Sequence, residues 1–64
     1  MRQNLIKLGS SIKLYRQKKD LTLVALAQMT DLTAGLLSRI ENFRTIPSLP
    51  VLLRIAQALE VTPA

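Results

Sequence analysis

Acid–base, nucleophilic and metal chemistry have little material in this sequence. Its 64 residues include no histidine and no cysteine, so the commonest general base and the thiolate nucleophile are missing. The only carboxylate side chains are Asp20, Asp31, Glu41 and Glu60, and their spacing along the chain forms no local acid–base pair. A phosphate-binding glycine loop and a cluster of metal ligands are also absent from the sequence. We therefore expect no enzyme activity, no cofactor and no bound metal.

The basic side chains offer a different chemistry, which is the binding of a polyanion. Nine Lys and Arg residues against four acids give a net charge of +5. Six of the nine fall in residues 1–19, which contain no acid: Arg2, Lys7, Lys13, Arg16, Lys18 and Lys19. Such a segment is either a solvated basic helix that aids solubility or an electrostatic footprint for nucleic acid. Charge alone leaves both interpretations open.

Two short helices joined by a tight turn are predicted within residues 22–42, and they favour nucleic acid. Thr22 and Thr33 have the side-chain chemistry of helix N-caps, and Asp31 separates the two helical runs. Apolar residues at i, i+3 and i+4 spacing give each helix one buried stripe, namely Leu23, Leu26 and Ala27, then Leu36, Leu37 and Ile40. A small residue such as Ala27 at the crossing is typical of a helix-turn-helix, which sets one helix into the DNA major groove.

Two further helices are predicted to complete the core. The first spans about residues 4–19 and has one apolar face: Leu5, Leu8, Ile12 and Tyr15. The other spans about residues 49–59, with Ser48 as its N-cap and Pro50 in its first turn, where proline is tolerated. Its expected buried side is Leu49, Leu52, Leu53, Ile55, Ala56 and Leu59. Because no strand pattern is present, we expect one all-α domain over residues 1–64, a compact bundle of four to five helices.

The last residues have the pattern that opens a helix. Val61, Thr62 and Pro63 provide an apolar residue, an N-cap and a first-turn proline, and the sequence ends at Ala64. We expect a truncated fifth helix that continues in a longer protein. No apolar run approaches the ~20 residues of a membrane span, and no signal peptide is evident. We therefore expect a cytoplasmic protein with no membrane partner.

The sequence resembles the phage-repressor-like (Xre-type, lambda repressor-like) helix-turn-helix domain. The similarity extends from Leu8 to the end of the chain, and the order and spacing of its segments make it specific. Its strongest segments are Leu26-Ala27, residues 37–42 (LSRIEN), and Pro47-Ser48-Leu49 followed by Leu52 and residues 55–61. Leu23 and the GLLS segment are similar to a subclass that carries a C-terminal cupin-like sensor domain.

The resemblance implies binding of a double-stranded DNA operator by a homodimer, with residues 33–42 as the recognition helix in the major groove. The implied base-reading residues are Thr33, Ala34, Gly35, Ser38 and Arg39. Arg39 is the best candidate because a guanidinium can bind guanine O6 and N7 together, the alternative being contact with phosphate only. Ala34 and Gly35 permit close approach but specify little. The implied phosphate-side residues are Thr22, Asn42, Arg44 and Thr45, of which Thr22 has a simple capping role as its alternative.

The same resemblance implies a structural, partly buried ion pair between Arg16 and Glu41. It also shows departures from the family pattern, because Asp20, Asp31 and Phe43 stand where members usually have glycine. Aspartate tolerates a positive φ better than most residues. For Phe43 two interpretations stay open: it extends the third helix by a turn, or it fills a gap left by the short core.

The leading functional hypothesis is sequence-specific DNA binding by a bacterial or phage transcriptional regulator. One alternative is a protein-interaction or antitoxin-type helix-turn-helix module, suggested by the apolar residues Leu23, Val24, Leu36 and Phe43. Another is a nonspecific DNA-binding protein, suggested by the weak reading capacity of Ala34 and Gly35.

Overall fold

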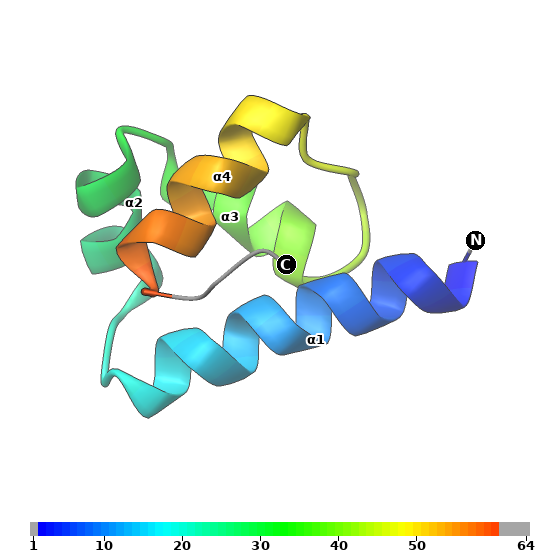
Figure 1. Cartoon of the computed structure of the whole chain (residues 1–64), viewed down its shortest axis with the longest axis horizontal. Helices are drawn as coiled ribbons and strands as arrows, with labels where there is room; N and C mark the ends of the chain where they lie inside the picture. The colour runs from blue at the N-terminus through cyan, green and yellow to red at the C-terminus, as the bar shows by residue number, and fades with distance from the viewer. Residues whose placement is uncertain (1, 61–64) are drawn as a thin grey trace.

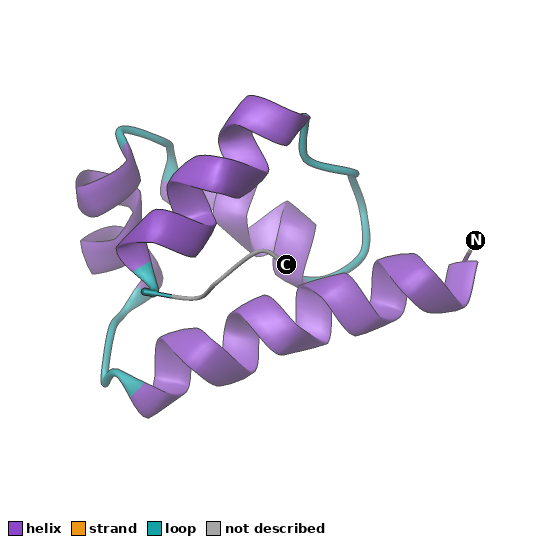
Figure 2. Ribbon diagram, in the orientation of Figure 1, coloured by secondary structure: helices purple, strands orange, loops and turns teal. Residues whose placement is uncertain are grey.

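The chain folds into four α-helices in the computed structural model, which describes the backbone of residues 2–60 and the side chains of residues 7–60. The helices are α1 (Arg2–Lys18), α2 (Leu23–Thr30), α3 (Ala34–Glu41) and α4 (Leu49–Ala58) (Figure 1). Figure 2 shows only helices and loops in this part of the chain. The predicted all-α class is confirmed. The expected start of a fifth helix lies outside the described residues.

α1 runs along one side of the molecule, and α2, α3 and α4 all lie on the same side of it (Figure 1). α2 contacts both α3 and α4, and α3 contacts α1. A tight turn of three residues, 31–33, separates α2 from α3. The helix-turn-helix predicted within residues 22–42 is therefore present, and both of its helices pack on their neighbours.

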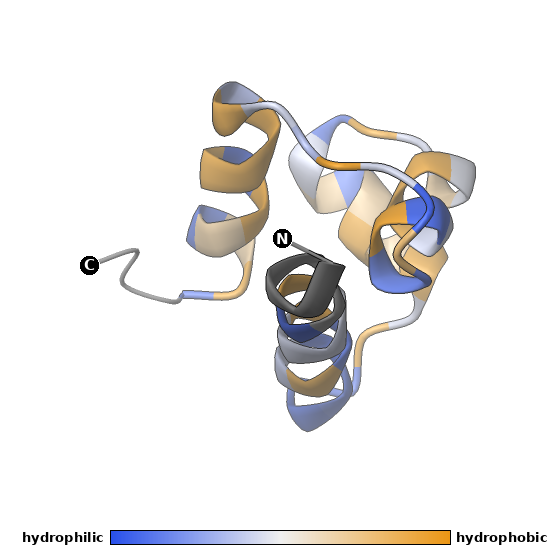
Figure 3. Cartoon of the chain, turned by 90° about the vertical axis from the view of Figure 1, so that its right-hand side faces the viewer, coloured by the Kyte–Doolittle hydropathy of each residue, from blue (hydrophilic) through white to orange (hydrophobic). Residues whose placement is uncertain are grey.

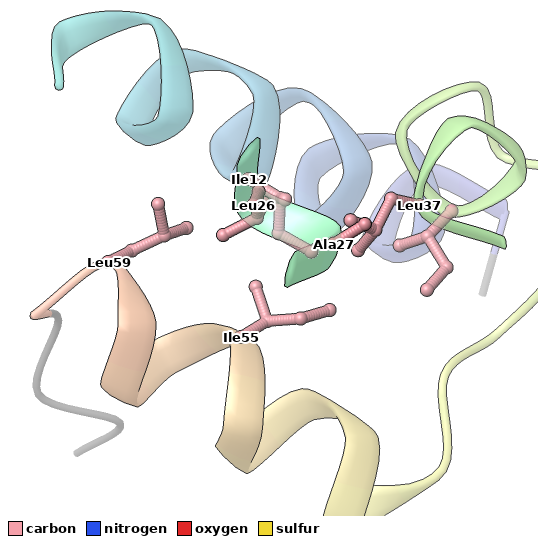
Figure 4. Close-up of a cluster of buried hydrophobic side chains, with 7 residues drawn as sticks. Ile12, Leu26, Ala27, Leu37, Ile55 and Leu59 are labelled. Atoms are coloured by element: carbon pink, nitrogen blue, oxygen red, sulfur yellow. The ribbon is translucent and has the colours of Figure 1, made fainter. Parts of the chain in front are cut away.

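Side chains from all parts of this arrangement meet in one small core (Figure 4). The buried apolar residues are Ile12, Leu26, Ala27, Leu37, Ile40, Ile55 and Leu59. The stripes predicted for α2 and α3 supply four of these seven, while Leu23 and Leu36 pack half-buried against them. Burying a leucine or isoleucine side chain contributes roughly 1.5–3 kcal/mol relative to exposure. The core therefore holds α2 and α3 by their inner faces and leaves their outer faces open.

The buried faces predicted for α1 and α4 were too wide. Leu49 is 67% exposed, Leu53 is 39% exposed and Tyr15 is 41% exposed. Leu49 lies in the first turn of α4, whereas the buried Ile55 lies in its C-terminal half and the buried Leu59 follows its last residue. α4 is largely apolar in Figure 3. In such a helix more residues are apolar than its neighbouring helices can bury. The sequence does not show which of these apolar residues the neighbours reach.

One or two residues after its end, each helix is followed by a residue in the left-handed conformation, and none of these residues is glycine. Asp20, Asp31, Phe43 and Glu60 have φ values of 55°, 57°, 64° and 58°. Backbone bonds from the following residue close the first three turns: Leu21 N to Arg16 O, Leu32 N to Ala27 O, and Arg44 N to Arg39 O. This is the Schellman pattern, which glycine favours because it has no Cβ. The expectation of positive φ at the two aspartates is confirmed.

Phe43 does not extend α3, so that interpretation was wrong. α3 ends at Glu41, and Phe43 turns the chain away at φ 64°. Its ring lies against Gly9 of α1: a Cβ added to Gly9 would be 2.8 Å from Phe43 Cδ1 and 2.6 Å from the carbonyl oxygen of Ile40. Gly9 thus allows α1 to approach the end of α3 directly. The sequence signal for this contact was a glycine inside a helical pattern, which often marks close packing.

Candidate nucleic-acid interface

The two helices of the helix-turn-helix begin with the same capping geometry. Thr22 Oγ1 accepts a hydrogen bond from the amide of Ala25, and Thr33 Oγ1 accepts one from the amide of Leu36, both at 3.0 Å. Both threonines are exposed. Since a hydroxyl has one hydrogen to donate besides its lone pairs, each cap can still donate to a phosphate oxygen. The capping and the proposed DNA contact are therefore compatible at each threonine.

The outer side of α3 and the turn after it form a polar hollow. Ser38, Arg39, Asn42 and Arg44 line this hollow, which has a volume of about 500 Å³. Arg39 and Arg44 are exposed, and neither forms an ion pair within residues 7–60. The Asn42 side chain is held in place because its Nδ2 donates to the carbonyl oxygen of Ser38 at 2.8 Å. The hollow therefore presents two guanidinium groups and a fixed amide on one surface.

Of the remaining predicted site residues, some lie on the exposed surface of α3 and others are half-buried. Gly35 is exposed, and a Cβ added there would meet no atom within 4 Å. Ala34 is half-buried against the core, so it lies less on the exposed start of α3 than expected. Thr45 is also half-buried and does not line the hollow. The structure thus brings together Ser38, Arg39, Asn42 and Arg44, with Gly35 and the two capping threonines nearer the helix starts.

The inner side of α3 is tied to α1 by the predicted ion pair, which is confirmed. Arg16 Nε donates to Glu41 Oε2 at 2.7 Å and Arg16 Nη2 donates to Glu41 Oε1 at 3.0 Å, while Nη1 donates to the carbonyl oxygen of Leu21 at 2.7 Å. The side chains are 11% and 4% exposed. The hydrogen bonds to Glu41 raise the pKa of Arg16 above its ordinary value. This forked geometry fixes the rotation of α3 relative to α1.

The basic segment predicted at the N-terminus presents fewer unpaired charges than its sequence suggests. Arg16 is directed inward to Glu41, and Lys19 Nζ lies 2.7 Å from Glu60 Oε2. The hydrogen bond from Lys19 lowers the pKa of Glu60 below its ordinary value. Lys18 lies over the ring of Tyr15, 5.9 Å from its centre. Arg39 on α3 and Arg44 after it are, by contrast, exposed and in no ion pair within residues 7–60.

Other kinds of site are not evident in the part of the chain that the structure describes. No group of three or more potential metal-ligating side chains occurs there. None of the helices described is both long enough and apolar enough to cross a membrane. A groove of about 230 Å³ between α1 and α4 is lined mostly by apolar side chains, among them Leu8, Ile12 and Leu52. The polar hollow on α3 is thus the best candidate site.

Comparison with known proteins identifies the family. A family model described as helix-turn-helix matches residues 12–64, which includes all of α2, α3 and α4. The searches of curated proteins and of solved structures found no match. The matched family consists of DNA-binding domains rather than enzymes. With two capped helices, a three-residue turn and an exposed outer face on the second helix, the chain belongs to the phage-repressor-like (Xre-type, lambda repressor-like) helix-turn-helix family.

Proposed function

We propose that this protein binds operator DNA sequence-specifically, as the DNA-reading part of a bacterial or phage transcriptional regulator in the cytoplasm. The observation that carries the proposal is the two-sided character of α3. Its inner side is buried through Leu37, Ile40 and Glu41, and its outer side carries the polar hollow. A B-DNA major groove is about 12 Å wide and admits an α-helix. A helix that is fixed to the core on one side and exposes polar side chains on the other can therefore enter the major groove.

The proposed contacts divide into base reading and phosphate binding. Arg39 on the outer side of α3 reads a base, because its guanidinium can make two bonds to guanine O6 and N7. Gly35, with open space around it, lets the start of α3 approach the base edges. The proposed phosphate contacts are Thr22, Thr33, Asn42, Arg44 and Thr45. These contacts supply orientation and affinity without reading sequence. Thr33 is placed among them, and not among the base-reading residues that the resemblance implied, because its hydroxyl caps the start of α3 by accepting from the amide of Leu36.

We also propose that the protein acts as a homodimer. Two copies of α3 would then engage half-sites about 34–36 Å apart, one helical turn of DNA. Ala34 contributes close approach in this arrangement, since it has no hydrogen-bonding group. A single copy would bind more weakly because it contacts half as many phosphates.

The proposal is tested by changing the charge of the outer face without touching the core. Gly35→Glu places a carboxylate in the first turn of α3, where the helix dipole favours it and where no neighbour obstructs a side chain. We expect the variant to fold and to lose at least about tenfold in DNA affinity, because its charge faces the phosphates. The matched control is Gln57→Glu, which makes an equal change of charge. Gln57 is an exposed residue of α4 that lies near Asp31, the residue after α2.

The measurement is a gel shift over a range of salt, combined with selection from random DNA. Log affinity should fall with log salt by about 0.9 for each phosphate neutralised, and the selection should enrich a palindromic sequence. A flat salt response, or equal binding by Gly35→Glu and Gln57→Glu, would contradict the proposal. Uniform binding of all sequences would instead support the nonspecific DNA-binding alternative.

The protein-interaction alternative draws on exposed apolar side chains. Of the four residues that suggested it, Val24 and Phe43 are exposed, whereas Leu23 and Leu36 are half-buried against the core. Ile46 and Leu49 are also more than half exposed, which suits contact with another protein. If the folded, dimeric protein binds no DNA at low salt, this alternative replaces the proposed function.

A further inference from the structure

Two hydroxyl groups on the helix-turn-helix have opposite roles in their hydrogen bonds: that of Thr30 donates and that of Ser38 accepts. In α2, Thr30 is buried, and its Oγ1 donates to the carbonyl oxygens of Leu26 at 2.8 Å and Ala27 at 3.2 Å. Its hydrogen is therefore used inside its own helix. In α3, Ser38 lines the polar hollow and makes no such bond to a carbonyl within residues 7–60. Instead, Ser38 Oγ accepts a hydrogen bond from Asn42 Nδ2 at 3.3 Å.

The orientation of the Asn42 amide follows from a second bond of the same nitrogen. Nδ2 also donates to the backbone carbonyl oxygen of Ser38 at 2.8 Å. A carbonyl oxygen only accepts, so the reversed amide would put two acceptor oxygens against each other. The NH₂ group of Asn42 must therefore face Ser38. Its carbonyl oxygen points away from this pair of bonds.

This contact determines how the Ser38 hydroxyl can bind a ligand. A hydroxyl has one hydrogen to donate and two lone pairs. The Asn42 amide uses one lone pair, and its partial positive charge disfavours a further donor beside the same oxygen. The hydroxyl hydrogen is then left for an acceptor in the hollow, which Arg39 and Arg44 also line. All three side chains present donors to whatever enters.

We propose that Ser38 is a specificity-determining residue that acts as a hydrogen-bond donor, and that Asn42 is the positioning residue that gives it this role. The base it selects is guanine, whose major-groove edge presents the two acceptors N7 and O6. Cytosine is disfavoured because its N4 amino group is a donor facing a donor. This proposal rests on the proposed function, since it names the base chemistry read by the same face of α3.

The experiment compares the sequence preferences of four proteins by selection from random DNA at low salt: the unaltered chain, Ser38→Ala, Asn42→Ala and Ser48→Ala. Ser48→Ala is the matched control. It removes the same hydroxyl from an exposed serine whose side chain makes no capping hydrogen bond. We expect Ser38→Ala and Asn42→Ala to reduce the preference for guanine over cytosine about fivefold, at one and the same base position. Ser48→Ala should leave that preference unchanged.

The position-specific ratio separates this role from a structural one, because general loss of phosphate contacts or stability weakens binding to all sequences alike. A preference that survives in Asn42→Ala but not in Ser38→Ala would overturn the positioning role. A selected cytosine at the position that depends on Ser38, or profiles unchanged in both variants, would overturn the whole inference while leaving the proposed function standing. No enriched sequence from the unaltered chain would overturn both.

Discussion

The helices α2 and α3 are built alike and differ in what their outer sides carry. Each has eight residues and a threonine cap that bonds the third residue after it at 3.0 Å, and each is followed by a left-handed residue other than glycine. Each also buries three residues. The exposed side of α2 carries the uncharged residues Val24, Gln28 and Met29, whereas α3 exposes Gly35 and Arg39.

This difference shows that local structure alone does not distinguish the two helices. The inner side of α2 is occupied by Leu26, Ala27 and Thr30, which make no charged contact. The inner side of α3 includes Glu41, whose ion pair with Arg16 fixes its rotation. We interpret α2 as a helix that holds α3 in place within the fold, and α3 as the helix whose outer side faces the DNA. Changes to the inner sides should alter stability, and changes to the outer sides should alter DNA binding in α3 only.

The largest effect is expected from Glu41→Gln on the inner side of α3. Glutamine keeps one acceptor oxygen but removes the charge and puts an NH₂ donor toward the other guanidinium nitrogen, so Arg16, which is 11% exposed, loses its counter-charge. Losing one member of a buried ion pair costs about 3–5 kcal/mol of unfolding free energy. Urea unfolding measures it. A variant within about 0.5 kcal/mol of the unaltered protein would mean that the pair is effectively solvated.

A smaller loss is expected from Ala27→Leu on the inner side of α2. Ala27 is buried in the core beside Leu26, so three added carbons must displace their neighbours. Overpacking of this kind costs about 1–3 kcal/mol. Met29→Leu, a change of similar chemistry on the exposed side of α2, is the control and should leave the thermal melting curve unaltered. Equal melting of both variants would show that Ala27 is not at a tight contact.

On the outer sides, Arg39→Ala and Arg44→Ala should weaken DNA binding in different ways. Loss of a bidentate base contact removes about 1–3 kcal/mol of discrimination at one base position, whereas loss of a phosphate contact weakens all sequences and lowers the salt slope by about 1. Gln28→Ala on the outer side of α2 should change neither quantity. Titrations against matched and scrambled DNA test this division, which fails if the two arginine variants behave identically.

Gly35→Ala should stabilise the fold slightly. An alanine at this position meets no atom within 4 Å and restricts the unfolded chain, so we expect a gain of about 0.5–1 kcal/mol. Chemical denaturation provides the measurement. Destabilisation would show that α3 requires its glycine for a reason other than space.

The smallest effect concerns the contact between Lys19 and Glu60, outside both helices. The pKa of Glu60 is lowered from 4.5 in the folded state, so its contribution is complete above pH 4.5 and is lost as the pH falls through the lower folded value. Because Glu60 is largely exposed, the effect is small. Glu60→Gln should flatten the dependence of the melting temperature on pH below 4.5. A steeper dependence in the variant would contradict the assignment.

The sequence by itself determined the elements that depend on neighbours along the chain. Thr22 and Thr33 cap their helices, and each predicted stripe turns inward, with Leu26, Ala27, Leu37 and Ile40 buried. Both follow from the chain itself, because capping bonds and helical periodicity involve residues only three or four positions apart. The family resemblance added the pairing of Arg16 with Glu41, which joins residues 25 positions apart. These features were sufficient to predict the helix-turn-helix.

Only the tertiary structure decided the features that depend on distant segments. Gly9 is needed because α1 meets the carbonyl groups of Ile40 and Glu41, and Leu49 is exposed because no described neighbour covers the first turn of α4. Arg44 lines the hollow beside Ser38 because Phe43 turns the chain at a positive φ that its side chain does not favour. In each case the physical reason is the same. A residue pattern shows which side chains are apolar or polar, but which of them are buried depends on which other helix packs against that segment.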